Sequence, residues 1–254
     1  MDILSALFRW LHILAGIVWI GMLYFFNWVN GPFQGTLDAD SKKKVNPELL
    51  PRALYWFRWG AAWTWFTGVV LLLLVFYHGG IVFEGDGRWQ PAAIVMALSV
   101  YVSALVYDAL HKSALGKDPK LFGAVAFVLL AALAALMHYW GGFGYRALNI
   151  HLAATFGTLM AYNVWFRIWP AQQSILKAVK EGAAPDPALV AMAGARSRHN
   201  VYMSVPLLWG MVNQHTTTVA LPGALGFATF LVVTLIGWHI VWQLYKKAPS
   251  IKGF

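Results

Sequence analysis

Long apolar stretches constrain the fold of this chain more than any other feature. A helix that crosses the hydrocarbon core of a bilayer needs roughly 20 mainly apolar residues. Because lipid offers no hydrogen-bond partners to the backbone, such segments must satisfy their own polar groups, as helices do. Stretches of this kind occupy residues 4–29, 55–78, 92–112, 121–140, 145–169, 198–216 and 224–246. The sequence therefore predicts an all-α, polytopic transmembrane helix bundle of about seven spans.

The composition of the chain and the length of its first apolar stretch support one membrane domain. Charged residues make up 11 % of the chain, whereas soluble domains carry about 25 %. The first apolar stretch is too long for the core of a signal peptide, so we expect it to be the first span. Residues 1–254 are thus predicted to form a single transmembrane domain. Residues 171–197, which include Pro185-Asp-Pro187, are predicted to form a cytoplasmic or interfacial loop with short amphipathic helices.

The basic residues predict the orientation of the spans. Of the 19 lysines and arginines, all but Arg9, Arg88 and Arg146 fall in or beside alternate loops and the C-terminus. The positive-inside rule therefore places the N-terminus outside and the C-terminus in the cytoplasm. The net charge of +9 is explained by this topology, and no nucleic-acid partner is expected.

Several kinds of chemistry are excluded or disfavoured. The chain has no cysteine, so it can hold neither an iron–sulfur cluster with cysteine ligands nor a covalently attached haem c. It also lacks a glycine-rich phosphate loop and a Ser-His-Asp pattern in a hydrolase context. The predicted spans contain few carboxylates, which disfavours a proton-coupled transporter.

The eight histidines are the residues most suggestive of function. A neutral imidazole is a common haem ligand, and ionisable groups inside a membrane usually have a function. The predicted topology places five histidines in the outer half of the membrane, namely His12, His78, His138, His151 and His215. The inner half contains His111, His199 and His239. Two such tiers could ligate two b-type haems that carry electrons across the bilayer, and a single haem in one tier is the alternative.

Position along the helices narrows the choice of ligands. Four histidines lie at helix ends, where an imidazole can face water or headgroups: His78, His111, His138 and His199. His12, His151 and His239 lie deeper, where an unpartnered imidazole would be costly. The candidate axial pairs are His12 with His151 or His215 in the outer tier, and His239 with His199 in the inner tier. The candidates for holding haem propionates, or for anchoring to headgroups, are Arg9, Arg58, Arg196 and Arg198. Asn213 and His215 are the candidates for an outer polar site that binds a substrate.

Five sequence elements carry a family resemblance. They are Arg9-Trp-Leu-His12, Trp63-Thr-Trp-Phe-Thr-Gly68, Tyr107-Asp108, Gly157-Thr-Leu-Met-Ala-Tyr-Asn-Val164 and Arg196-Ser-Arg-His-Asn200. Together they resemble the N-terminal membrane domain of bacterial membrane-bound urate oxidase (urate hydroxylase). The resemblance implies a protein of the bacterial inner (plasma) membrane. It also implies oxidation of urate to 5-hydroxyisourate, with electrons passed to a fused cytochrome c domain.

The first element is also similar to that of haem-binding membrane families, including the four-helix protoporphyrinogen oxidases. In that family a histidine of the first helix binds haem b, which makes His12 the best single haem candidate here. The sequence contains no Cys-x-x-Cys-His. We therefore expect a separate cytochrome c or a quinone to accept the electrons, and the chain could be a subunit of a larger membrane complex.

A function of a different class stays open. The helix over 145–169 carries threonines and amides that can bond between helices without any ligand. The chain could thus be a cofactor-free membrane scaffold subunit or a carrier of a small anion. That alternative predicts that neighbouring side chains satisfy every histidine.

Overall fold

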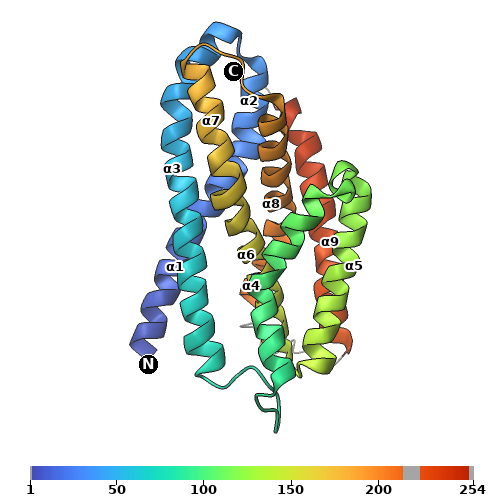
Figure 1. The fold of residues 1–254 in the computed structure, drawn as a ribbon. Helices are drawn as coiled ribbons and strands as arrows, with labels where there is room; N and C mark the ends of the chain where they lie inside the picture. Colours follow the sequence, from blue (N-terminus) through green and yellow to red (C-terminus); the bar gives the residue numbers. More distant parts are fainter. Residues whose placement is uncertain (1, 214–223, 252–254) are drawn as a thin grey trace. The chain divides into compact units, whose positions relative to one another are not determined.

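The computed structural model describes residues 2–213 and 224–251, and within these ranges the chain is helical and contains no strand (Figure 1). The all-α prediction is confirmed for this part of the chain. The chain contains α-helices with short π-helical and 3₁₀ turns between and after them. The α-helices are α1 (Asp2–Tyr24), α2 (Gly31–Thr36), α3 (Ala39–Leu71), α4 (Pro91–Lys112), α5 (Pro119–Ala135), α6 (Tyr145–Asn163), α7 (Trp169–Lys180), α8 (Pro187–Asn213) and α9 (Ala224–Lys247). The π-helical turns are η1 (Phe25–Asn30), η2 (Leu72–Tyr77), η4 (Leu136–Trp140) and η5 (Val164–Ile168), and the 3₁₀ turns are η3 (Ala114–Lys117) and η6 (Ala248–Ser250).

Five helical segments of the described residues are long and apolar enough to cross a membrane. They are Ile3–Thr36, Ala39–Tyr77, Pro91–Lys112, Pro119–Trp140 and Gly226–Ser250. Each contains one of the predicted spans or most of it. The chain is therefore a membrane protein with several apolar helices, as its composition indicates.

The predicted span 145–169 falls mainly in α6 and η5, and the described part of the predicted span 198–216 falls in α8; both are more polar than the five apolar segments. Helix α6 buries most of its circumference, and the amide of Asn149, the imidazole of His151 and the hydroxyl of Thr155 are all at most 4 % exposed. In α8, Asn200 and Ser204 are both 0 % exposed. These polar residues lower the mean hydropathy of the two helices. They are tolerated there because they are buried and bond inside the protein instead of facing lipid.

Two boundaries differ from the prediction. Helix α3 begins at Ala39, well before residue 55, and runs through two prolines. The segment 171–197, predicted as a loop with short amphipathic helices, contains most of α7 in its first half and the start of the long helix α8 in its second half. Asp186 caps that start, because its carboxylate accepts a bond of 2.8 Å from the backbone N–H of Ala188.

The chain divides into two compact units. Unit 1 comprises Met1–Val70, Met160–Ser204 and Trp238–Phe254, and unit 2 comprises Leu71–Leu159 and Val205–Gly237. Each unit combines segments that are far apart in the sequence, so long-range helix packing holds each unit together.

Glycines allow close helix contacts inside each unit. In unit 1, a Cβ on Gly60 of α3 would lie 3.0 Å from the backbone nitrogen of Trp19 in α1. In unit 2, a Cβ on Gly210 of α8 would lie 2.6 Å from the Cβ of Ala153 in α6. Small residues at such positions let helix backbones approach closely. In lipid, where the hydrophobic effect does not drive helices together, this close packing holds them in contact.

Candidate functional site

His12 lies in α1 with its ring oriented by α3. Its Nδ1 is 3.0 Å from Oγ1 of Thr67, which is only 1 % exposed. The Thr67 hydroxyl already donates its hydrogen to the carbonyl of Trp63, at 2.6 Å. The hydroxyl oxygen must therefore accept, and Nδ1–H of His12 must donate. This bond selects the tautomer in which Nε2 carries the lone pair.

Gly68 provides the space for the His12 ring. A Cβ at this position would lie 3.0 Å from Cε1 of His12 and 3.5 Å from its Nδ1. A distance of 3.0 Å is closer than ordinary van der Waals contact, so any larger residue would displace the imidazole. The consecutive residues Thr67 and Gly68 thus hold one ring by a hydrogen bond and by close packing.

The His12 ring fits axial ligation of a haem. A metal-ligating histidine usually donates its second ring N–H to a protein acceptor, which orients the ring and raises the basicity of the ligating nitrogen. His12 shows this arrangement with Thr67. The backbone carbonyl of Thr64 also accepts a hydrogen bond from the ring, and in this tautomer only Nδ1–H can donate it, so among the described residues Nε2 keeps its lone pair. The lone pair is therefore available to iron.

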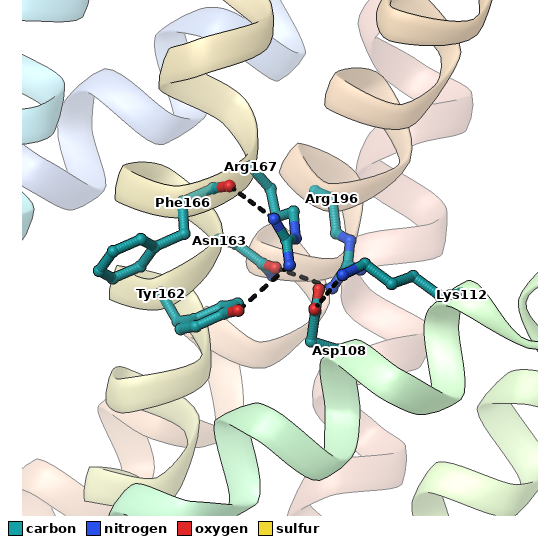
Figure 2. Close-up of polar contacts among 7 residues, drawn as sticks. All are labelled: Asp108, Lys112, Tyr162, Asn163, Phe166, Arg167 and Arg196. Atoms are coloured by element: carbon teal, nitrogen blue, oxygen red, sulfur yellow. Dashed lines mark hydrogen bonds and ion pairs between the residues drawn. The ribbon is translucent and has the colours of Figure 1, made fainter.

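A buried polar cluster in unit 1 centres on Arg196 of α8. Its Nη1 donates to Oδ1 of Asn163 over 3.1 Å, and Nδ2 of Asn163 donates to Oδ1 of Asn200 over 2.8 Å. Nδ2 of Asn200 then donates to the carbonyl of Met160 over 3.0 Å. Figure 2 shows Arg196 pointing toward Asn163. Arg196 is 1 % exposed, and both asparagines are 0 % exposed. The amide orientations therefore follow from the requirement to satisfy a buried cation.

The residues of the His12 site and of the Arg196 cluster lie within sequence elements that carry the family resemblance. The sequence model of the family described as "Urate oxidase N-terminal" matches residues 1–248. The chain belongs to this family. No curated protein and no solved structure matches it. The family assignment confirms the resemblance inferred from the five sequence elements.

His151 of this urate oxidase N-terminal chain has a different environment from that of His12. Its Nδ1–H donates to the carbonyl of Ala147 over 2.7 Å, so its Nε2 must be the acceptor. The hydroxyl of Tyr77 in η2 donates to this Nε2 over 3.0 Å. The ring is 0 % exposed, and Phe143 contacts it edge-on with ring centroids 4.7 Å apart. To ligate iron, His151 would have to exchange the Tyr77 hydroxyl for the metal.

The remaining candidate ligands occupy less enclosed positions. His239 in α9 is exposed, and Nε2 of Gln243 lies 3.2 Å from its Nε2. His199 in α8 is half-buried. His12, His199 and His239 belong to unit 1, whereas His151 belongs to unit 2. His215 lies outside the described residues.

The candidate propionate-binding arginines differ in their surroundings. Arg9 is exposed. Arg198 is exposed too, with its guanidinium 5.7 Å from the ring centre of Tyr245. The guanidinium of Arg58 lies 3.9 Å from the ring centre of Trp169. Arg196 is the buried member of the set and already bonds to Asn163.

Asn213 belongs to a polar cluster in unit 2. Its side-chain amide donates to the hydroxyl of Tyr145, and Asn149 donates to the carbonyl of Tyr145 over 2.9 Å. The backbone N–H of Tyr145 donates in turn to the carboxylate of Glu84 over 2.7 Å. Within the described part of the chain, Oδ1 of Asn149 is buried and has no hydrogen-bond partner. A buried amide oxygen without a donor is suited to accept a bond from a small polar ligand or from water.

Sequence reasoning missed a second polar cluster of unit 1. Asn27 in η1 donates to Oγ of Ser197 over 2.8 Å and accepts from the hydroxyl of Tyr245 over 2.9 Å. The hydroxyls of Tyr24 and Ser204 lie 3.0 Å apart. An asparagine inside the apolar stretch 4–29 was the available signal, because an amide at membrane depth needs partners inside the protein.

Asp108 in α4 pairs locally. Its Oδ2 lies 2.8 Å from Nζ of Lys112, one turn further along the same helix, and Figure 2 draws this pair. Asp108 is 5 % exposed, whereas its lysine partner reaches the surface. The lysine ammonium thus compensates part of the cost of burying the carboxylate.

Proposed function

We propose that this chain is an integral membrane redox protein that binds haem b through His12. The observation that carries the proposal is the state of the His12 ring. Its Nδ1–H donates to Thr67, its Nε2 is left with a free lone pair among the described residues, and Gly68 leaves room for the ring. A bound haem supplies one-electron redox chemistry at membrane depth.

Each residue of the site has a defined task in this proposal. Nε2 of His12 holds the iron, and Thr67 fixes the orientation and the tautomer of the ring. His199 and His239, which belong to the same unit as His12, would hold a second haem. Arg196 and Arg198 are suited to hold propionates, since a guanidinium binds a carboxylate through two N–H groups.

The proposed topology has seven spans, with the N-terminus outside and the C-terminus in the cytoplasm of a bacterial inner membrane. The distribution of lysine and arginine supports it, as do the five apolar helices. Helices α6 and α8 would supply the other two spans. Their buried polar groups are compatible with a membrane position because other parts of the protein satisfy them.

The family suggests urate as the reductant. Oxidation of urate to 5-hydroxyisourate takes its oxygen atom from water and releases two electrons and two protons, so a separate cytochrome c or a quinone has to accept the electrons as the oxidant. Urate is a flat anion and needs amide and cationic donors. We propose that it binds near Asn213 and His215 if this chain itself carries the activity. Otherwise the chain is the electron-transfer subunit of a larger membrane complex.

One observation favours a second candidate function, a cofactor-free scaffold subunit or a small-anion carrier. Protein groups engage both ring nitrogens of His151, as a histidine without a cofactor requires. This function predicts a colourless protein in which the His12 site has a structural role.

A reduced-minus-oxidised visible spectrum of the purified protein, with haem quantified per chain, separates the two functions. We expect a b-type spectrum in the wild type and its loss or marked weakening in His12→Ala. The control is His78→Ala, because His78 is exposed beside η2 and its removal should leave the spectrum unchanged. A folded protein that stays colourless when it is expressed with excess haem would overturn the proposal and favour the cofactor-free function.

A further inference from the structure

Arg58 in α3 is a half-buried cation that has no acidic partner in the described part of the chain. The ion pairs of the described residues do not include it, and its Nε is buried without an acceptor. Its guanidinium lies over the ring of Trp169 at 3.9 Å. A stacked guanidinium keeps its N–H groups directed outward in the plane, where they match the oxygens of a phosphate. The charge is therefore held in place for an anion.

Indole rings fix this arginine from the η5–α7 segment. Nε1 of Trp165 donates to the backbone carbonyl of Arg58 over 2.9 Å, and the ring of Trp165 meets that of Trp59 edge-on at 5.4 Å. Trp169 lies one turn beyond Trp165 and supplies the face on which the guanidinium stacks. The position of Arg58 thus depends on contacts between α3 and a segment that is distant in the sequence.

An apolar groove follows Arg58 along the same helix. It has a volume of about 240 Å³, and Trp59, Ala62, Trp63 and Phe66 line it. Ala62 and Phe66 come four and eight residues after Arg58, so all three lie on one stripe of the helix. The aromatic walls are 40 %, 55 % and 48 % exposed, in the order Trp59, Trp63 and Phe66. All lie within the candidate span Ala39–Tyr77, so the groove lies on a helix that is expected to cross the membrane.

The cation and the groove together match one kind of molecule. Helical side chains lean toward the N-terminus of their helix, which carries the guanidinium away from the groove. A polar anionic group therefore fits at one end and a hydrocarbon chain at the other. Residues 39–52 add to the positive potential because they carry a net charge of about +2. Their basic residues are Lys42, Lys43, Lys44 and Arg52, and their acidic residues are Asp40 and Glu48. Basic groups at a membrane surface attract anionic lipids.

We propose that Arg58 and the α3 groove form a binding site for one anionic phospholipid. The phosphodiester accepts hydrogen bonds from the Arg58 guanidinium, and an acyl chain lies along Trp59, Ala62, Trp63 and Phe66. Such a lipid would brace the contact of α3 with η5 and α7. This assignment makes Arg58 a headgroup ligand, although the sequence alone also offered it as a propionate ligand.

Native mass spectrometry of the detergent-solubilised protein tests this site by titration with dioleoyl phosphatidylglycerol and dioleoyl phosphatidylcholine. The two lipids share their acyl chains, so their difference isolates the net charge of the headgroup. We expect the wild type to retain the anionic lipid about 5- to 10-fold better. Arg58→Gln should abolish this preference, and Arg58→Lys should keep part of it. Ala62→Leu, which enlarges a residue that lines the groove, should weaken both lipids equally.

Arg52→Gln is the matched control. It removes the same charge from the same helix, but Arg52 is exposed and already pairs with Glu48 at 2.7 Å. It should leave the lipid preference unchanged. Equal effects of Arg52→Gln and Arg58→Gln would overturn the proposal, because only the general charge of the surface would then matter.

Two further outcomes would assign Arg58 to another anion. Displacement of the anionic lipid by millimolar inorganic phosphate would indicate a site for free anions, which overturns the lipid assignment. Loss of haem in a folded Arg58→Gln protein that keeps its lipid preference would assign Arg58 to a propionate. Because lipid retention is measured whether or not the protein is coloured, failure of the haem proposal leaves this test intact.

Discussion

The contact between Gly68 and His12 allows a quantitative test of the candidate haem site. Adding a methyl group at Gly68 has two opposing effects. An alanine in a helix is more favourable than a glycine by about 1 kcal/mol. The new Cβ, however, would lie 3.0 Å from Cε1 of a ring that Thr67 holds by a hydrogen bond. Overpacking of this kind costs about 1–3 kcal/mol, so Gly68→Ala should be destabilising by about 1 kcal/mol on balance.

A double-mutant cycle isolates the contact. In the His12→Ala background the ring is absent, and the same Gly68→Ala change should stabilise by about 1 kcal/mol. The coupling between the two positions should therefore be about 2 kcal/mol, within the range known for residues in contact. Thermal unfolding of the four proteins in detergent, followed by intrinsic fluorescence, measures it as shifts of the unfolding midpoint.

Gly21→Ala is the control for helix propensity. Nothing lies within 4 Å of a Cβ at Gly21 in α1, so this change should stabilise both backgrounds equally. An identical effect of Gly68→Ala with and without the His12 ring would refute the reasoning, since the ring would then not be the obstacle. In haem-loaded protein, Gly68→Ala should also shift the Soret band, because a displaced imidazole changes the axial field.

Three further perturbations test other parts of the structure. Tyr77→Phe removes the donor to Nε2 of the buried His151 and should cost about 1–2 kcal/mol in thermal unfolding; an unchanged midpoint would show that the bond contributes nothing. Gly210→Ala places a Cβ 2.6 Å from that of Ala153 and should reduce the yield of folded protein, measured by size-exclusion chromatography, because helix backbones cannot yield as a flexible side chain can. The third perturbation concerns Asp38, which precedes α3. The backbone N–H and the hydroxyl of Ser41 donate hydrogen bonds to its carboxylate, and these bonds hold the pKa of Asp38 below its ordinary value. The ionised Asp38 therefore stabilises the folded protein above about pH 4, and this contribution disappears as the pH falls through the lowered pKa. The difference in thermal unfolding midpoint between the wild type and Asp38→Asn should shrink between pH 6 and pH 3. A constant difference would refute the capping role.

The helical nature of the chain could be predicted because it depends on local information. Apolar stretches of membrane length must satisfy their own backbone bonds, whatever packs against them. The first and last residues of the helices were harder to predict from the sequence. Helix α3 begins at Ala39 instead of residue 55, because good helix formers such as lysine and glutamate continue it through two prolines near its polar end.

The environment of α6 was only partly predictable. Its threonines and amides were visible as a polar stripe, which suggested bonds between helices. The partners could not be read from the sequence, since Asn163 bonds to Asn200 in α8 and His151 bonds to Tyr77 in η2. Both partners lie more than thirty residues away, beyond the reach of any helical periodicity.

What the sequence determines by itself is the helical fold class, the membrane character, the family and His12 as the leading candidate ligand. What only the tertiary structure decides is the chemical state of each histidine. Two histidines of similar predicted depth differ because Thr67 orients His12 and leaves its Nε2 free among the described residues, whereas Tyr77 occupies that nitrogen in His151. The physical reason is that a ring nitrogen is satisfied by whichever group packs against it. Helices distant in the sequence supply that group.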